Sequence, residues 1–321
     1  MDLITKEKLN QVKNDADKMS IRQDVKAHCA KIRDGINKNG STSGNRAIWE
    51  LFQNADDFAK NGSTEIQITL TNETFVFAHK GIPFTYGSLS SLVKQESSQE
   101  KENDDTVGRF GTGFLTTHKF SRKTNVNGSM RISENPEVFV DVNDFEIDRT
   151  HFDEIDRFID DMADQICAVK ALFDGEQKTT AREWTSLTYE LNDERKIIAQ
   201  KAIDEAMKLM PYVLTFNDKL TSCTIDDKTR NQIITYNKVD KTTSVSGLLC
   251  KSIMISRNGE APSSFDCYYL EMHDGNSRII LPLESETHVR SLAGIPKLFV
   301  HFPLIPQNGQ DYFGVNFLFH Y

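Results

Sequence analysis

Three polar side chains lie at helical spacing in one short segment of the chain. In AIWELFQNADDFAK, Glu50, Asn54 and Asp57 occupy positions i, i+4 and i+7. At about 100° per residue they point the same way from a helix, and the apolar residues gather on the opposite side. Two carboxylates and an amide could hold a divalent cation or activate a water molecule. A solvated polar face is the alternative interpretation of this helix alone.

A second set of candidate residues consists of closely spaced glycines. The segment FAHKGIPF turns at Gly81, and the later run GRFGTGF carries Gly108, Gly111 and Gly113. Glycines at this spacing let the backbone approach a ligand closely and direct N–H groups at an anion. An acidic helix could hold a cation against that anion. Glycines serve many turns, however, and GxxGxG is not the order of a Rossmann dinucleotide-binding loop.

These residues need a helix, a hairpin and a loop to position them. The pattern predicts a helix over Arg46–Lys60 that ends at Asn61-Gly62. The alternating segments EIQITL and TFVFAH predict two strands joined by a turn at Thr71–Glu73. The stretch Gly87–Val107 is polar and predicts a mobile surface loop.

The rest of the chain predicts a mixture of helices and strands. Helical spacing indicates further helices at about Ile21–Ile36, Leu115–Phe120, Phe152–Leu172 and Glu194–Met210. A strand is expected from Thr185, and the last third is rich in strand patterns, including a hairpin around HDGNS. We expect a domain boundary near Asp193. Because the chain stops in the apolar segment FGVNFLFHY, we also expect it to be the front part of a longer protein.

Composition narrows the class of protein. The 38 basic and 47 acidic side chains leave a net charge of -9, which argues against broad nucleic-acid binding. No apolar run approaches the roughly 18 residues of a membrane span, and the polar N-terminus does not resemble a secretory signal. The five cysteines form no CxxC pair, and no zinc-ligand spacing or GxxxxGK[ST] loop occurs. These features favour a cytoplasmic protein.

Four segments together resemble the motifs of the GHKL ATPase superfamily, which includes gyrase, the ninety-kilodalton heat-shock chaperone, histidine kinases and MutL. WELFQNADD is similar to its first signature, HKGIPF to its Asp-x-Gly-x-Gly turn, and GRFGTGF to its glycine-rich lid hinge. The strand at Thr185 resembles its last motif. The agreement covers about Arg46–Leu191, and HKGIPF is most similar to sacsin-type, heat-shock-chaperone-like members.

The resemblance implies a role for each matching residue. Glu50 is expected to be the general base, and Asn54 to supply an oxygen to Mg²⁺. Asp57 would support the base or the adenine side, and Thr185 would lie near the adenine edge. The remaining nucleotide-binding residues are expected to be His79, Gly81, Gly108, Arg109, Phe110, Gly111, Thr112, Gly113 and Phe114.

Two residues depart from the family pattern. His79 stands where the family has its adenine-reading Asp, and Pro83 replaces a glycine of that turn. If His79 reads adenine as a neutral acceptor, ATP affinity should weaken as pH falls through about 6.5. The alternative is that His79 only packs the strand end. The departures also leave open an inactive pseudo-ATPase.

The resemblance implies an α+β fold of the Bergerat type over residues 1–193, with a sheet covered on one face by helices. A smaller α/β region resembling a transducer or middle domain would occupy residues 194–321. The expected function is slow, Mg²⁺-dependent ATP hydrolysis that drives lid closure in a larger chaperone-like or prokaryotic defence-type protein. The alternative is an ATP-gated interaction module with negligible turnover. Protein partners or clients are expected, a homodimer is allowed, and neither membrane nor nucleic acid is expected as a partner.

Overall fold

The structure is a computed structural model that describes residues 3–38, 44–96, 113–245, 248–272, 277–285, 288–303 and 317–320. The chain packs into two compact units. Unit 1 comprises Met1–Ser43 and Ile82–Glu190, and unit 2 comprises Gly44–Gly81 and Leu191–Tyr321. The division at residue 193 stays a prediction, and the compact units follow a different partition because residues 44–81 pack with the last third of the chain.

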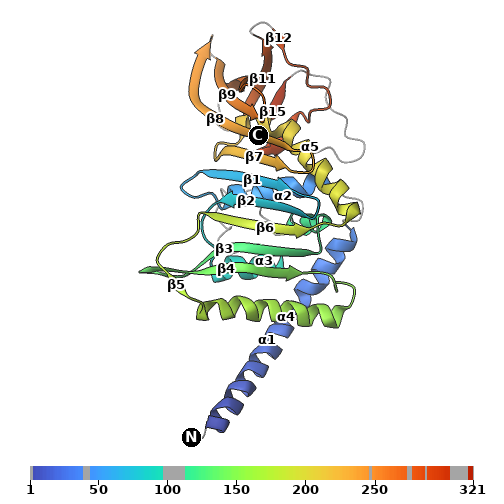
Figure 1. Cartoon of the computed structure of the whole chain (residues 1–321), viewed down its shortest axis with the longest axis vertical. Helices are drawn as coiled ribbons and strands as arrows, with labels where there is room; N and C mark the ends of the chain where they lie inside the picture. The colour runs from blue at the N-terminus through green and yellow to red at the C-terminus, as the bar shows by residue number, and fades with distance from the viewer. Residues whose placement is uncertain are drawn as a thin grey trace. The chain divides into compact units, whose positions relative to one another are not determined.

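Unit 1 combines an antiparallel sheet with helices (Figure 1). Its sheet has the order β6-β3-β4-β5, formed by Trp184–Glu190, Lys123–Glu134, Glu137–Asp148 and Gln177–Lys178. Its helices are α1 (Leu3–Lys38), α3 (Tyr86–Lys94) and α4 (Ile155–Ala171), with the 3-10 turns η3 (Gly113–Lys119) and η4 (Leu172–Asp174). The strands β3 and β4 were not predicted from the sequence.

The core of unit 1 forms between α1, α4 and the sheet. Phe158, Met162 and Ile166 lie on one face of α4 and are buried, as their helical spacing predicts. Cys29 of α1 is also buried, and its Sγ lies 3.6 Å from Met162 Sδ. The amphipathic helix predicted over Phe152–Leu172 is therefore confirmed, and it begins at Ile155.

Unit 2 contains α2 (Gly44–Asp57), α5 (Asp193–Phe216) and a larger mixed sheet. The sheet has the order β14-β13-β15-β11-β10-β9-β8-β7-β1-β2, and β12 pairs with β11. Its first strands are β1 (Thr64–Leu70), β2 (Thr74–Lys80), β7 (Leu220–Asp227), β8 (Gln232–Val245) and β9 (Leu248–Arg257). The others are β10 (Ser263–Glu271), β11 (Arg278–Ser285), β12 (His288–Val289), β13 (Leu298–Val300), β14 (Phe302–Pro303) and β15 (Leu318–His320).

The sheet of unit 2 has one covered face near β1 and β2. Buried and less buried residues alternate along both strands, as expected when one face packs on a helical layer. The pairing Ile68↔Phe77 and Ile66↔His79 puts all four of these side chains on the buried face. The predicted α+β class, with a sheet covered on one face by helices, is confirmed.

Two local predictions need correction. The stretch Gly87–Val107 is not wholly a loop, because α3 spans Tyr86–Lys94. Thr85 and Ser88 form a reciprocal capping box at the start of this helix, and Leu89 and Val93 are buried. Residues 97–107 lie outside the described residues. The first helix is also longer than predicted, since it spans Leu3–Lys38 rather than Ile21–Ile36.

Candidate functional site

Helix α2 presents the polar face that its spacing predicts. Its buried side carries Ile48, Leu51, Phe52 and Ala55. Phe52 packs edge-on against Phe77 of β2, with ring centroids 5.3 Å apart, and α2 also contacts α5. These apolar contacts fix the orientation of α2, and they therefore also fix the direction in which its polar side faces.

Glu50, Asn54 and Asp57 are neither fully buried nor fully exposed. The Glu50 side chain is 17% exposed, and Arg46 Nε donates to its Oε1 at 3.3 Å. The carboxylate therefore lies beside the guanidinium group of Arg46 and remains partly exposed. Two carboxylates and one amide are thus carried on the same side of α2.

His79 ends the buried face of β2 and is 8% exposed. Burial lowers its pKa to about 4, and a backbone hydrogen bond with Lys80 opposes this effect. The imidazole is therefore neutral at physiological pH. Its Nδ1 has no hydrogen-bond partner among the described residues. The pH window expected from an ordinary histidine, near 6.5, is thus wrong for this side chain and moves to about 4.

Gly81 lies directly against the end of α2. A Cβ at this position would stand 2.7 Å from the backbone oxygen of Phe58 and 3.1 Å from His79 Nδ1. Real Cβ atoms do not come closer than 3.0 Å to a backbone atom of this kind, so a residue with a side chain would push the turn away from the helix. The glycine predicted from the sequence is thus needed for close approach of two backbone segments.

The other predicted residues belong to unit 1 or lie outside the described residues. Gly113 begins η3, and Phe114 and Thr185 are buried. Thr185 Oγ1 lies 3.0 Å from the position that a Cβ on Gly128 would take, so β3 and β6 are tightly packed there. Gly108, Arg109, Phe110, Gly111 and Thr112 lie outside the described residues.

Sequence reasoning missed Asp56, which lies between two predicted site residues. Its side chain is only 3% exposed. It accepts a hydrogen bond from Asn217 and forms an ion pair with Lys219. The sequence signal is confined to an acidic residue on the edge of the apolar face of α2. The partners of Asp56 lie just beyond the C-terminal end of α5, where Asn217 is the capping residue and Lys219 follows two residues later.

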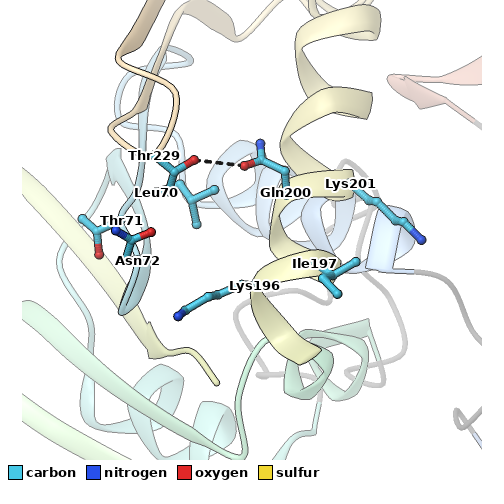
Figure 2. Close-up of a pocket in the computed structure, with 8 residues that line it drawn as sticks. All are labelled: Leu70, Thr71, Asn72, Lys196, Ile197, Gln200, Lys201 and Thr229. Carbon is cyan, nitrogen blue, oxygen red and sulfur yellow. Dashed lines mark hydrogen bonds between the residues drawn. The ribbon is translucent and has the colours of Figure 1, made fainter. Parts of the chain in front are cut away.

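Unit 2 also contains a pocket of about 400 Å³ between α5 and two turns (Figure 2). It is lined by Leu70, Thr71, Asn72, Lys196, Ile197, Gln200, Lys201 and Thr229. Gln200 is hydrogen-bonded to both Thr229 and Asp227, and Lys196 forms an ion pair with Asp193 at 3.1 Å. Several of the polar lining groups are thus engaged in hydrogen bonds or ion pairs within the protein. The pocket contains none of the predicted nucleotide-binding residues.

Membrane-spanning helices and protein-only metal sites are both absent from the residues that the structure describes. No helix among them is long and apolar enough to cross a membrane. No group of three or more His, Cys, Asp or Glu side chains in these ranges is placed to hold a metal ion by itself. A metal ion on α2 would therefore need oxygen atoms from a ligand or from water in addition to the protein.

No family model matches the chain, and no curated protein matches it. Among solved structures, the chain is similar to the 43K ATPase domain of Thermus thermophilus gyrase B in complex with an aminocoumarin. The identity is 11%, the TM-score 0.30, and the match covers 67% of this chain and 57% of that chain. It is also similar to the B-subunit of the DNA gyrase from Myxococcus xanthus, with 9% identity and a TM-score of 0.31. That match covers 67% of this chain and 62% of that chain, so the chain spans less than two thirds of either structure.

Proposed function

We propose that this chain binds ATP together with Mg²⁺ and hydrolyses it slowly, as a GHKL-type ATPase. One observation carries the proposal. Helix α2 presents Glu50, Asn54 and Asp57 on one half-buried face, and the turn at Gly81 abuts the end of the same helix. The four motifs that resemble the superfamily supply the identity of the ligand.

The residues on α2 have the chemistry that this function requires. Glu50 is the base that orients and deprotonates the attacking water, and Arg46 holds its carboxylate in place. Asn54 offers a hard amide oxygen, which suits Mg²⁺, a cation usually held by few protein oxygens plus phosphates and water. When bound, the cation neutralises developing charge on the phosphates. Asp57 completes the polar face.

We assign the turn at the end of β2 to binding of the adenine ring of ATP. His79 is neutral, so it can accept one hydrogen bond through an unprotonated ring nitrogen and donate another. Gly81 lets the chain pass close to α2. The roles of Gly113, Phe114 and Thr185 stay predictions from the sequence resemblance.

We assign the chain to a larger protein in which the nucleotide cycle drives conformational change, of a chaperone-like or defence type. The alternative, an ATP-gated interaction module, shares the binding residues but not the turnover. The two are separated by measuring ATP binding by calorimetry and phosphate release, each with Mg²⁺ and with EDTA. Binding with Mg²⁺-dependent release supports the ATPase. Binding without release favours the interaction module, and absence of binding contradicts both.

A further inference from the structure

A buried polar cluster joins α2 to the far end of α5. Asp56 Oδ1 accepts a hydrogen bond from Asn217 Nδ2 at 2.6 Å, and Asp56 Oδ2 lies 3.3 Å from Lys219 Nζ. Lys219 Nζ also lies 3.4 Å from the backbone oxygen of Asp56. Both carboxylate oxygens are thus engaged, as a carboxylate that is only 3% exposed requires.

Asn217 is itself fixed by the chain around it. It is fully buried and caps α5, and its backbone N–H donates to Val213 at 2.8 Å. Its Oδ1 accepts from the backbone N–H groups of Lys219 and Leu220, at 2.9 and 2.7 Å. The side chain that holds Asp56 therefore has no freedom to follow a movement of α2.

The same cluster continues to the turn at the end of β2. The backbone N–H of Thr64 donates to the oxygen of Lys219 at 2.9 Å. The hydroxyl of Thr64, a residue that is 1% exposed, donates to the backbone oxygen of Lys80 at 2.7 Å. Lys80 lies between His79 and Gly81, so a continuous set of hydrogen bonds links Asp56 to the turn.

We propose that Asp56 is a positioning residue, which acts through Asn217, Lys219 and Thr64 to hold the end of α2 at a set distance from the His79–Gly81 turn. The close approach of Phe58 to Gly81 depends on this distance. The inference rests on the proposed function in one respect only, which is that ATP is the ligand contacted by both α2 and the His79–Gly81 turn. Asp56 contacts the protein and has no assigned role on the nucleotide itself.

The physical reason lies in the cost of a broken buried network. Replacing a buried, paired carboxylate removes charge and leaves polar partners unmatched. In Asp56→Asn the amide can still accept from Asn217, but it can no longer pair with the ammonium group of Lys219. Lys219→Met removes the same ion pair from its more exposed side, since Lys219 is 37% exposed. The two substitutions should therefore have effects of the same kind.

The test uses the full chain, and the matched control is Asp226→Asn. Asp226 lies on β7, the strand that follows Lys219, and its carboxylate is 29% exposed and lies 4.0 Å from Lys228 Nζ. Hydrogen exchange measured on the peptide that covers residues 77–84 reports directly on the turn. Calorimetry with ATP and with GTP reports on base discrimination.

We expect exchange in this peptide to become about fivefold faster in both test variants, and the preference for ATP over GTP to fall by a similar factor. The control should match the unsubstituted protein. A role limited to overall stability would speed exchange in the other protected peptides as much as in this one and would leave the preference for ATP over GTP unchanged, and that result would overturn the inference. If Asp56→Asn does not fold, Lys219→Met decides. If the unsubstituted protein binds no ATP, the proposed function fails and hydrogen exchange alone decides the positioning role.

Discussion

The backbone oxygen of Phe58 lies 2.7 Å from the place where a Cβ on Gly81 would stand. The end of α2 and the end of β2 are thus in contact, backbone against backbone. Glu50, Asn54 and Asp57 are on the first of these elements, and His79 closes the second. Because this contact is tight, a change in the position of the end of α2 should also shift the end of β2, and the reverse should hold too.

Gly81→Ala should destabilise the protein and weaken nucleotide binding. The added methyl group overlaps a backbone atom that cannot move alone, and overpacking of this kind costs about 1–3 kcal/mol. Urea unfolding measures this cost. Gly87→Ala is the matched control, because the nearest atom to its added Cβ is 3.6 Å away and alanine favours the helix α3. Equal stability of the two variants would contradict the packing argument.

The stability of the protein should depend on pH through His79. Its pKa is lowered from 6.5 to about 4 in the fold, so the unfolded chain binds more protons between these values. The free energy of unfolding should therefore be fully retained above about 6.5 and fall as pH drops toward 4, by up to about 3 kcal/mol. His79→Phe should remove this part of the dependence in urea titrations from pH 4 to 8. A slope unchanged by the substitution would assign it to other groups.

Over the range from pH 5.5 to 8 the same histidine predicts flat ATP affinity. The imidazole stays neutral throughout, so its hydrogen-bonding capacity does not change. Calorimetry at several pH values tests this. If His79 reads adenine, His79→Ala should lose the preference for ATP over GTP. If it only packs the strand end, the preference should remain.

Asn54→Ala should weaken binding of Mg²⁺-ATP at least tenfold, which is about 1.4 kcal/mol. The substitution removes one hard oxygen from α2 and leaves its buried face intact. Calorimetry with Mg²⁺ and with EDTA should show the loss only in the presence of the cation. Gln53→Ala, on the same half-buried helix, serves as the control. A loss of the same size in EDTA would exclude the metal role.

Glu50→Gln should separate binding from turnover. The amide keeps the size of the side chain but cannot take a proton from water, so hydrolysis should fall by roughly 10²-fold while ATP still binds. Phosphate release and calorimetry on the same preparation measure the two effects. Glu73→Gln removes an exposed carboxylate from the β1–β2 turn and should leave both unchanged. Normal hydrolysis in Glu50→Gln would assign the base to another residue.

Local patterns in the sequence were sufficient for the elements that carry the site. The apolar spacing of α2 predicted both its helical form and its polar face, and the turn at Thr71 was confirmed, with its N–H donating to the oxygen of Thr74 at 2.9 Å. Helix α4 was predicted for the same reason. In each case neighbours along the chain contain the whole periodic signal.

Other elements were decided by burial that local patterns do not express. Helix α3 has the polar composition of a loop, but its capping box and the burial of Leu89 and Val93 make it helical. The long strands β3 and β4 alternate weakly in hydrophobicity, and they are stabilised by pairing with each other, with β6 on the side of β3 and with β5 on the side of β4. Tertiary contacts overrode propensity at these positions.

The sequence by itself determined which residues face outward from α2 and that a glycine follows the strand β2. Only the tertiary structure decided the contacts of Asp56, because its partner Asn217 is 161 residues away. It also decided the charge of His79, because the desolvation that keeps the imidazole neutral comes from burial on the covered face of the sheet. Periodicity reports on neighbours along the chain, whereas hydrogen bonding and desolvation depend on whichever residues folding brings into contact.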